Sequence, residues 1–202
     1  MDLRTDALTW NTDYGYILNT LPTIAEEDRK LWMSYNGETE HQIGRYVNWA
    51  DVADKITSPG DVIEFGTFRG LGLLMWAQCF KDSQVPRQFI GIDSFEGLPE
   101  SSTMWHKGEF SETSETWALT EIDNNFPQNS QLSYQLIKGW FNDPGVAEKL
   151  YKICNNPVAV HFDADLGSST TTALNITEHY LTGRSEPIYF FFDDWGCHPD
   201  EV

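Results

Sequence analysis

Aspartate residues gather at two points where the chain leaves an apolar run. Asp163 and Asp165 follow one run, and Asp193 and Asp194 follow the next run along the chain. Ends of neighbouring parallel strands lie about 5 Å apart, so these carboxylates can converge. Carboxylates gathered without a cation raise one another's pKa, and a divalent ion removes that cost. We therefore predict that Asp163, Asp193 and Asp194 hold Mg²⁺ or Mn²⁺, although each acid alone is better explained as a strand-end cap.

A glycine-rich turn follows an earlier apolar run. Residues 64–72 read EFGTFRGLG, which is E-x-G-x-x-x-G and differs from the dinucleotide pattern G-x-G-x-x-G. Asp93 ends the next apolar run, where a carboxylate can accept both hydroxyls of a ribose. The turn alone is as well explained without a ligand, but turn and Asp93 together favour a nucleoside cofactor. Because Glu64 would repel a pyrophosphate, S-adenosylmethionine fits best, with Gly66 leaving space for the ligand.

The elements that position these residues alternate between two types. Apolar runs predict buried strands at residues 61–65, 88–92, 132–137, 158–162 and 188–192. Helices are expected at 71–80, 114–125, 146–154 and 169–181, and two more at 25–35 and 40–56. Apolar strands separated by helices indicate a doubly wound, mostly parallel α/β sheet, which binds ligands at the carboxyl ends of its strands. A break at residues 58–60 divides a helical or lid segment, 1–57, from the main domain, 58–202.

Composition narrows the class of partner. The 202 residues carry a formal net charge of −18, which disfavours nucleic acid and anionic membranes as partners. No apolar run reaches the roughly 18 residues that a membrane span needs. The three cysteines are scattered, which is typical of a reducing compartment, so a cytoplasmic location is expected.

Five segments resemble a known family. EFGTFRG, IDSFEGLPE, LIKGWFND, HFDADLGSST and FFFDDWG are similar, in order, to motifs of the macrocin-type, metal-dependent sugar O-methyltransferases (the TylF, MycF and NovP group). The resemblance implies a class I methyltransferase (Rossmann-like) fold that uses S-adenosylmethionine and Mg²⁺. It implies a small-molecule acceptor, a sugar or glycosylated natural product methylated on a hydroxyl, and a homodimer is compatible with it.

The resemblance also implies roles for single residues. Asp165 would be the general base; the alternative from the sequence is that it caps the helix that follows. Glu64, Gly66, Thr67, Phe68, Asp93 and Ser94 would line the cofactor, and Gly139 and Trp140 would lie near its adenine. The sequence departs from the family's pattern at two points. Gly167 replaces an aromatic residue, and the chain ends at Val202, so the family's usual C-terminal helix and β-hairpin are expected to be missing.

Other classes of enzyme have aspartates in a similar pattern. The D-x-D pattern also resembles metal-dependent phosphatases and glycosyltransferases, but neither class explains Glu64–Gly70 together with Asp93. A third alternative is a truncated, non-catalytic domain that only binds the cofactor. Of the histidines, His161 is expected to be a buried, hydrogen-bonded strand residue with no catalytic role. Trp105 and Trp140 are candidates for stacking on a sugar or adenine, with core packing the default for Trp140.

Overall fold

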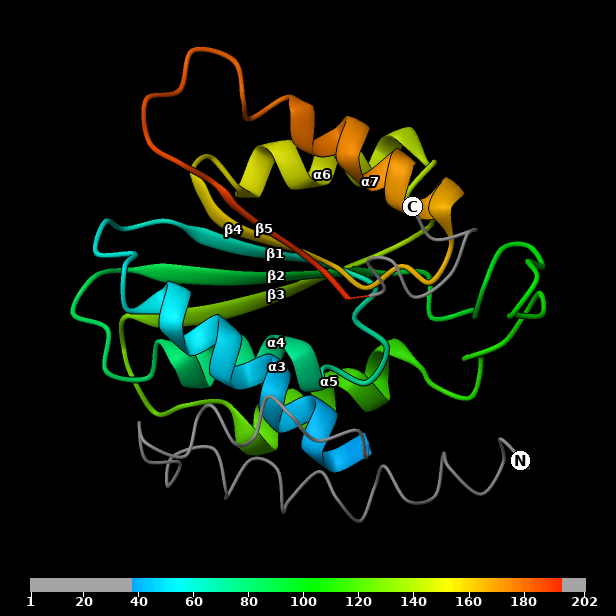
Figure 1. The fold of residues 1–202 in the computed structure, drawn as a ribbon, viewed down its shortest axis with the longest axis horizontal. Helices are drawn as coiled ribbons and strands as arrows, with labels where there is room; N and C mark the ends of the chain where they lie inside the picture. Colours follow the sequence, from blue (N-terminus) through cyan, green and yellow to red (C-terminus); the bar gives the residue numbers. More distant parts are fainter. Residues whose placement is uncertain (1–37, 194–202) are drawn as a thin grey trace. The chain divides into compact units, whose positions relative to one another are not determined.

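The computed structural model describes residues 38–193, which contain one five-stranded sheet (Figure 1). Its strands are β1 (Asp61–Phe65), β2 (Arg87–Asp93), β3 (Leu132–Lys138), β4 (Pro157–Phe162) and β5 (Tyr189–Phe192). They lie in the order β3-β2-β1-β4-β5, and every neighbouring pair is parallel. The predicted doubly wound α/β fold is confirmed, and each predicted strand end lies within one residue of the observed one.

Helices cover both faces of this sheet. The described helices are α3 (Glu38–Ala53), α4 (Leu71–Cys79), α5 (Glu115–Asn125), α6 (Pro144–Ile153) and α7 (Gly167–Glu178). Helices α6 and α7 lie on one face and α4 and α5 on the other (Figure 1). The α5 helix starts at a Ser114 cap whose hydroxyl accepts from the Trp117 N–H. The α6 helix starts at Pro144, two residues before the predicted position, because proline is well suited to a first helical turn.

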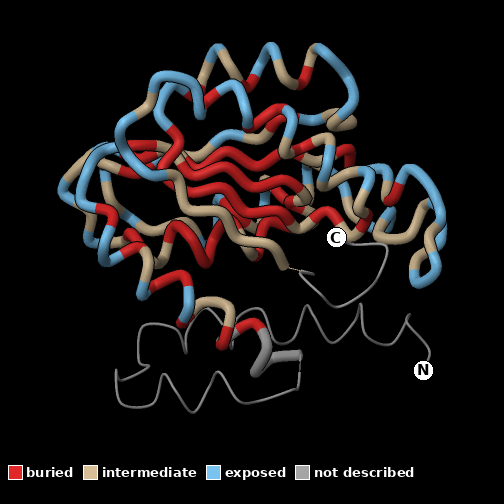
Figure 2. The backbone as a smooth tube through the Cα atoms, turned by 45° about the horizontal axis from the view of Figure 1, so that its top comes forward, coloured by how far each residue is buried: buried red, intermediate tan, exposed pale blue. Residues whose placement is uncertain are grey.

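The core lies between the strands and these two helical layers. Strand residues such as Phe65 and Phe162 pack with Leu150 of α6 and Ala173 of α7 in one buried cluster. On the other face the Trp76 ring lies 4.9 Å from the ring of Phe191. Buried residues run along the centre of the sheet in Figure 2. Burial on both faces explains why these strands are apolar at nearly every position.

The described residues cluster into two compact units. One contains residues 38–57 and 78–80, and the other contains 58–77 and 81–193. In the first unit, the Arg45 guanidinium lies 5.7 Å from the centre of the Trp49 ring. A role for residues 1–57 as a lid segment stays a prediction. The helix expected at 25–35, and the end of the chain beyond Asp193, lie outside the described residues.

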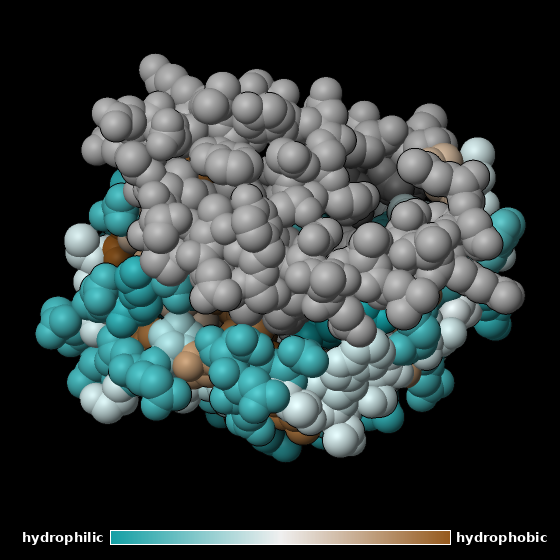
Figure 3. Space-filling model, turned by 90° about the horizontal axis from the view of Figure 1, so that it is seen from below, coloured by the Kyte–Doolittle hydropathy of each residue, from teal (hydrophilic) through white to brown (hydrophobic). Residues whose placement is uncertain are grey.

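The described surface visible in Figure 3 is mostly hydrophilic, with small apolar areas between polar side chains. Within the described residues, no helix has both the length and the apolar character needed to span a bilayer.

Candidate functional site

The carboxyl edge of the sheet contains the point where strand order reverses. From β1 the chain adds β2 and β3 on one side, and then β4 and β5 on the other. The reversal therefore lies between β1 and β4, which is where sheets of this type bind ligands.

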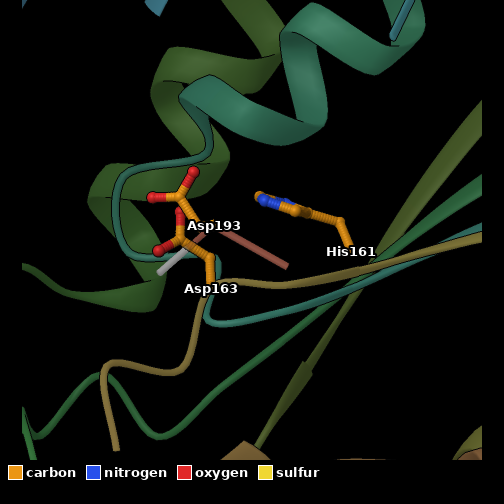
Figure 4. A group of neighbouring side chains, drawn as sticks. All are labelled: His161, Asp163 and Asp193. Carbon is orange, nitrogen blue, oxygen red and sulfur yellow. The ribbon is translucent and has the colours of Figure 1, made fainter. Parts of the chain in front are cut away.

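Asp163 and Asp193 are fixed on this edge by the sheet itself. The Asp163 N–H donates to the Phe65 carbonyl at 2.9 Å, and the Asp193 N–H donates to the Phe162 carbonyl at 3.0 Å. The backbone of each acid thus continues the hydrogen bonding of a parallel strand pair past the end of the strand. One ligand atom each from His161, Asp163 and Asp193 lies within 4.8 Å of the others (Figure 4). Ligands of a six-coordinate ion at about 2.1 Å are spaced on this scale, so the group fits a divalent cation. Asp194 lies outside the described residues.

Asp165 follows Asp163 in a left-handed backbone conformation, with φ of 57°. Such a conformation in a non-glycine residue costs about 1–3 kcal/mol and is concentrated at functional sites. Helix α7 begins at Gly167, its N-cap residue is Leu166, and that cap makes no side-chain hydrogen bond. Asp165 lies one position before that N-cap residue, and its alternative role as a cap of α7 stays a prediction.

Asp93 ties the glycine-rich turn to the loop after β2. Its Oδ2 accepts from the Phe68 N–H at 2.8 Å and its Oδ1 accepts from the Phe95 N–H at 2.6 Å. Both phenylalanines have left-handed backbones, with φ of 47° and 56°. Burial raises the pKa of the Asp93 carboxyl, and the backbone N–H groups partly offset that rise. Each carboxylate oxygen can accept more than one hydrogen bond, so the group fits a ribose diol as well.

The remaining predicted cofactor residues line the same edge. The Gly139 N–H donates to the Asp93 carbonyl at 2.9 Å, which places residues 139 and 140 beside the end of β2. Ser94 is buried, and its hydroxyl accepts from the Glu96 N–H at 3.1 Å. Thr67 is buried too, with Oγ1 2.5 Å from where a Cβ at Gly91 would lie. The turn and the loops after β2 and β3 are therefore adjacent, as a bound nucleoside requires.

Neighbouring protein atoms, rather than a ligand, explain why residue 66 is a glycine. Its φ is 91°, and an added Cβ would lie 1.6 Å from the carbonyl oxygen of Asp163. The sequence prediction gave the ligand as the reason for a glycine at this position. The immediate reason is the close approach of the chain after β4, because β4 is the neighbour of β1.

The loop after β2 reaches the start of α7. The Ser168 hydroxyl donates to the Glu100 carboxylate, so residues from this loop lie near the acids that follow β4. Within the loop the Trp105 ring lies 5.1 Å from that of Phe110, which lies 5.7 Å from that of Phe68. Trp105 thus belongs to an aromatic cluster against the glycine-rich turn.

Comparison with known proteins decides the family. The macrocin O-methyltransferase (TylF) family matches the chain over residues 42–200. This chain belongs to the macrocin O-methyltransferase family. It is therefore an O-methyltransferase, and neither the phosphatase nor the glycosyltransferase alternative receives support.

Two solved structures show how this macrocin-type O-methyltransferase relates to others. The O-methyltransferase NovP has a TM-score of 0.58 and 19% identity, over 86% of this chain and 79% of its own. CalS11, described as a TDP-rhamnose 3'-O-methyltransferase of calicheamicin biosynthesis, has a TM-score of 0.48 and 21% identity, over 90% and 79% of the two chains. No curated protein sequence matches the chain significantly. The NovP likeness supports the class I methyltransferase fold.

Sequence reasoning missed one neighbour of the acids in this O-methyltransferase. His161 is buried and hydrogen-bonded, as expected, with its Nδ1 3.0 Å from Oε1 of Glu64. Its place beside Asp163 and Asp193 was not predicted. The available signal was its spacing, because residues two apart on a strand point to the same face. Glu64, predicted to line the cofactor, is 2% exposed and contacts this histidine; its role toward a cofactor stays a prediction.

Proposed function

We propose that this protein transfers a methyl group from S-adenosylmethionine to a sugar hydroxyl of a small molecule, with help from a divalent metal ion. The observation that carries the proposal is the shared edge of the sheet. The carboxylates of Asp163 and Asp193 lie at the ends of β4 and β5, and the Asp93 carboxylate and the glycine-rich turn lie at the ends of β2 and β1. Membership of the macrocin O-methyltransferase family supplies the reaction type and favours a sugar as the acceptor.

The cofactor would lie across the ends of β1, β2 and β3. Asp93 would accept hydrogen bonds from the ribose hydroxyls, while Gly66, Thr67 and Phe68 face the methionine end. Ser94, Gly139 and Trp140 would flank the adenine. S-adenosylmethionine supplies a methyl group on a positively charged sulfur. The Glu64 carboxylate buried beneath this turn is consistent with a cofactor that has no phosphate.

The acceptor would be activated on the other side of the edge. Asp163, Asp193 and Asp194 would hold the ion. A divalent cation beside a hydroxyl lowers the pKa of that hydroxyl and orients it. The Asp165 carboxylate would accept the hydroxyl proton as the oxygen forms its bond to the methyl carbon and the S–CH₃ bond breaks, which leaves S-adenosylhomocysteine. Its left-handed backbone, two residues after Asp163, supports this placement.

Calorimetry and a transfer assay test the proposal together. S-adenosylhomocysteine should bind to the full chain with and without metal. A panel of nucleoside-diphosphate sugars and glycosides, incubated with methyl-labelled S-adenosylmethionine and Mg²⁺ or Mn²⁺, should contain a labelled product, and Asp165→Asn should form it much more slowly. Failure to bind S-adenosylhomocysteine, combined with phosphate release or sugar transfer from the same panel, would overturn the proposal. The homodimer and the cytoplasmic location stay predictions.

A further inference from the structure

The geometry points to His161 as a nitrogen ligand of the metal ion, positioned by Glu64, so that the site prefers a transition-metal ion over Mg²⁺. This inference rests on the proposed function, because it concerns the same ion. It adds a donor type that three aspartates do not supply.

His161 has the position that a ligand requires. It lies on β4 two residues before Asp163, whose N–H continues the β1–β4 hydrogen bonding just past the strand, so the two side chains point to the same face. One nitrogen of its ring lies within 4.8 Å of carboxylate oxygens of Asp163 and Asp193. Figure 4 shows the imidazole directed toward those two carboxylates. The side chain is 1% exposed, so its orientation is fixed by packing.

Glu64 selects which nitrogen faces the ion. Glu64 and His161 are paired across the β1–β4 register, and Glu64 Oε1 lies 3.0 Å from His161 Nδ1. In a neutral imidazole, the Nδ1–H donates to the Glu64 carboxylate and Nε2 keeps the lone pair that a metal needs. Histidine ligands of metals usually have such a carboxylate or carbonyl partner behind them. Both carboxylate and imidazole are buried, so the pair forms a rigid support.

Gly72 keeps the Glu64 carboxylate in this position. A Cβ at Gly72 in α4 would lie 2.0 Å from Glu64 Oε1. That oxygen is the same one that contacts His161. The absence of a side chain at residue 72 therefore leaves the space in which the carboxylate reaches the ring.

The donor set determines the preference for metals. Oxygen ligands alone suit Mg²⁺, whereas imidazole favours first-row transition ions such as Mn²⁺, Fe²⁺ and Co²⁺. One nitrogen with two or three carboxylates thus shifts selectivity from Mg²⁺ toward Mn²⁺ or Co²⁺. The alternative is that His161 only donates a hydrogen bond to an aspartate and never contacts the ion.

Spin-echo spectroscopy of the Mn²⁺-loaded full chain, freed of any histidine tag, distinguishes direct coordination by His161 from a hydrogen bond to an aspartate. A directly bound nitrogen gives ¹⁴N modulation, which should change when the histidines carry ¹⁵N. His161→Gln should lose the modulation, and the matched control His106→Gln should keep it, since His106 lies in the exposed part of the loop after β2. Absence of nitrogen modulation in the wild-type protein would overturn the inference, whatever the variants do.

Metal titrations separate this inference from the proposed function. His161→Gln and Glu64→Gln should each weaken Mn²⁺ affinity by about 10-fold or more and Mg²⁺ affinity much less. Asp163→Asn should weaken both. If only Asp163→Asn acts, His161 is not a ligand and the proposed metal dependence stands. If none of the three variants changes the affinity for either ion, both fail. Circular dichroism without metal checks that each variant is folded.

Discussion

The backbone N–H of Phe68 donates to the Asp93 carboxylate at 2.8 Å, across 25 residues of chain. This hydrogen bond fixes the glycine-rich turn against the end of β2. It also supports a left-handed residue, since Phe68 has a φ of 47°. Asp93 therefore has a structural role before any ligand binds, and a role in binding ribose is compatible with it.

Replacing Asp93 by alanine should weaken S-adenosylhomocysteine binding by about 1–3 kcal/mol, the scale for losing hydrogen bonds to a charged group. Part of the loss would come from a looser turn around Phe68. Isothermal titration calorimetry measures the effect, and Asp82→Ala, on an exposed loop, is the matched control. Equal affinities for wild-type and Asp93→Ala protein would refute the assignment of Asp93 to the ribose.

Cofactor affinity should depend on pH through Asp93. Burial raises the pKa of this carboxyl above the ordinary 3.8, so it becomes protonated at a higher pH than an exposed aspartate does. S-adenosylhomocysteine should therefore bind more weakly as the pH falls through that raised pKa. The stability of the fold depends on pH in the opposite direction. The neutral Asp93 carboxyl favours the folded state, and this contribution to stability is lost as the pH rises from 3.8 through the raised pKa. Metal-free calorimetry at several pH values tests the first effect, and Asp93→Asn should abolish it.

Gly66→Ala should destabilise the protein by more than about 2 kcal/mol, because the new Cβ collides with the Asp163 carbonyl as well as straining the backbone. Gly108→Ala is the matched control. Its φ of 82° is similar, but nothing lies within 4 Å of the added Cβ, so only the backbone cost of about 1–2 kcal/mol remains. Chemical denaturation compares them. Similar losses would show that the contact with Asp163 does not constrain residue 66.

The strands and the acids at their ends could be predicted from the sequence, because burial on both faces produces uninterrupted apolar runs that end abruptly. The contact between Glu64 and His161 could not, since the two residues are 97 positions apart and meet only through the β1–β4 register. The same register explains why the reason for Gly66 was missed: the atom closest to an added Cβ belongs to Asp163, directly after β4, and the sequence does not specify that β4 lies beside β1. The predicted start of α6 was two residues late because Pro144 and Gly145, taken in isolation, suggest a turn.

Removing the metal should abolish methyl transfer and leave most of the cofactor affinity. Asp163 and Asp193 belong to the group that would hold the ion, whereas Asp93 and the glycine-rich turn, which would bind the cofactor, do not depend on it. EDTA treatment, followed by a transfer assay and by calorimetry with S-adenosylhomocysteine, measures both. Full turnover in excess EDTA would contradict a metal-assisted reaction.

Asp165→Asn should lower kcat by about 10²-fold or more, the scale of general-base catalysis, with metal and cofactor affinities retained. Asparagine is nearly isosteric and tolerates the left-handed backbone, so the fold should be preserved. Ser168→Ala, which removes only the hydrogen bond to Glu100, is a nearby control. Near-native turnover in Asp165→Asn would leave activation of the hydroxyl to the metal alone.

The most direct test is a crystal structure of the full chain with S-adenosylhomocysteine and Mn²⁺, using anomalous scattering to locate the ion. We expect the ribose hydroxyls on Asp93 and an anomalous peak about 2.1–2.2 Å from oxygens of Asp163 and Asp193. A cofactor bound away from the glycine-rich turn, or an ion at any other place in the fold, would contradict a methyltransferase site at this edge of the sheet.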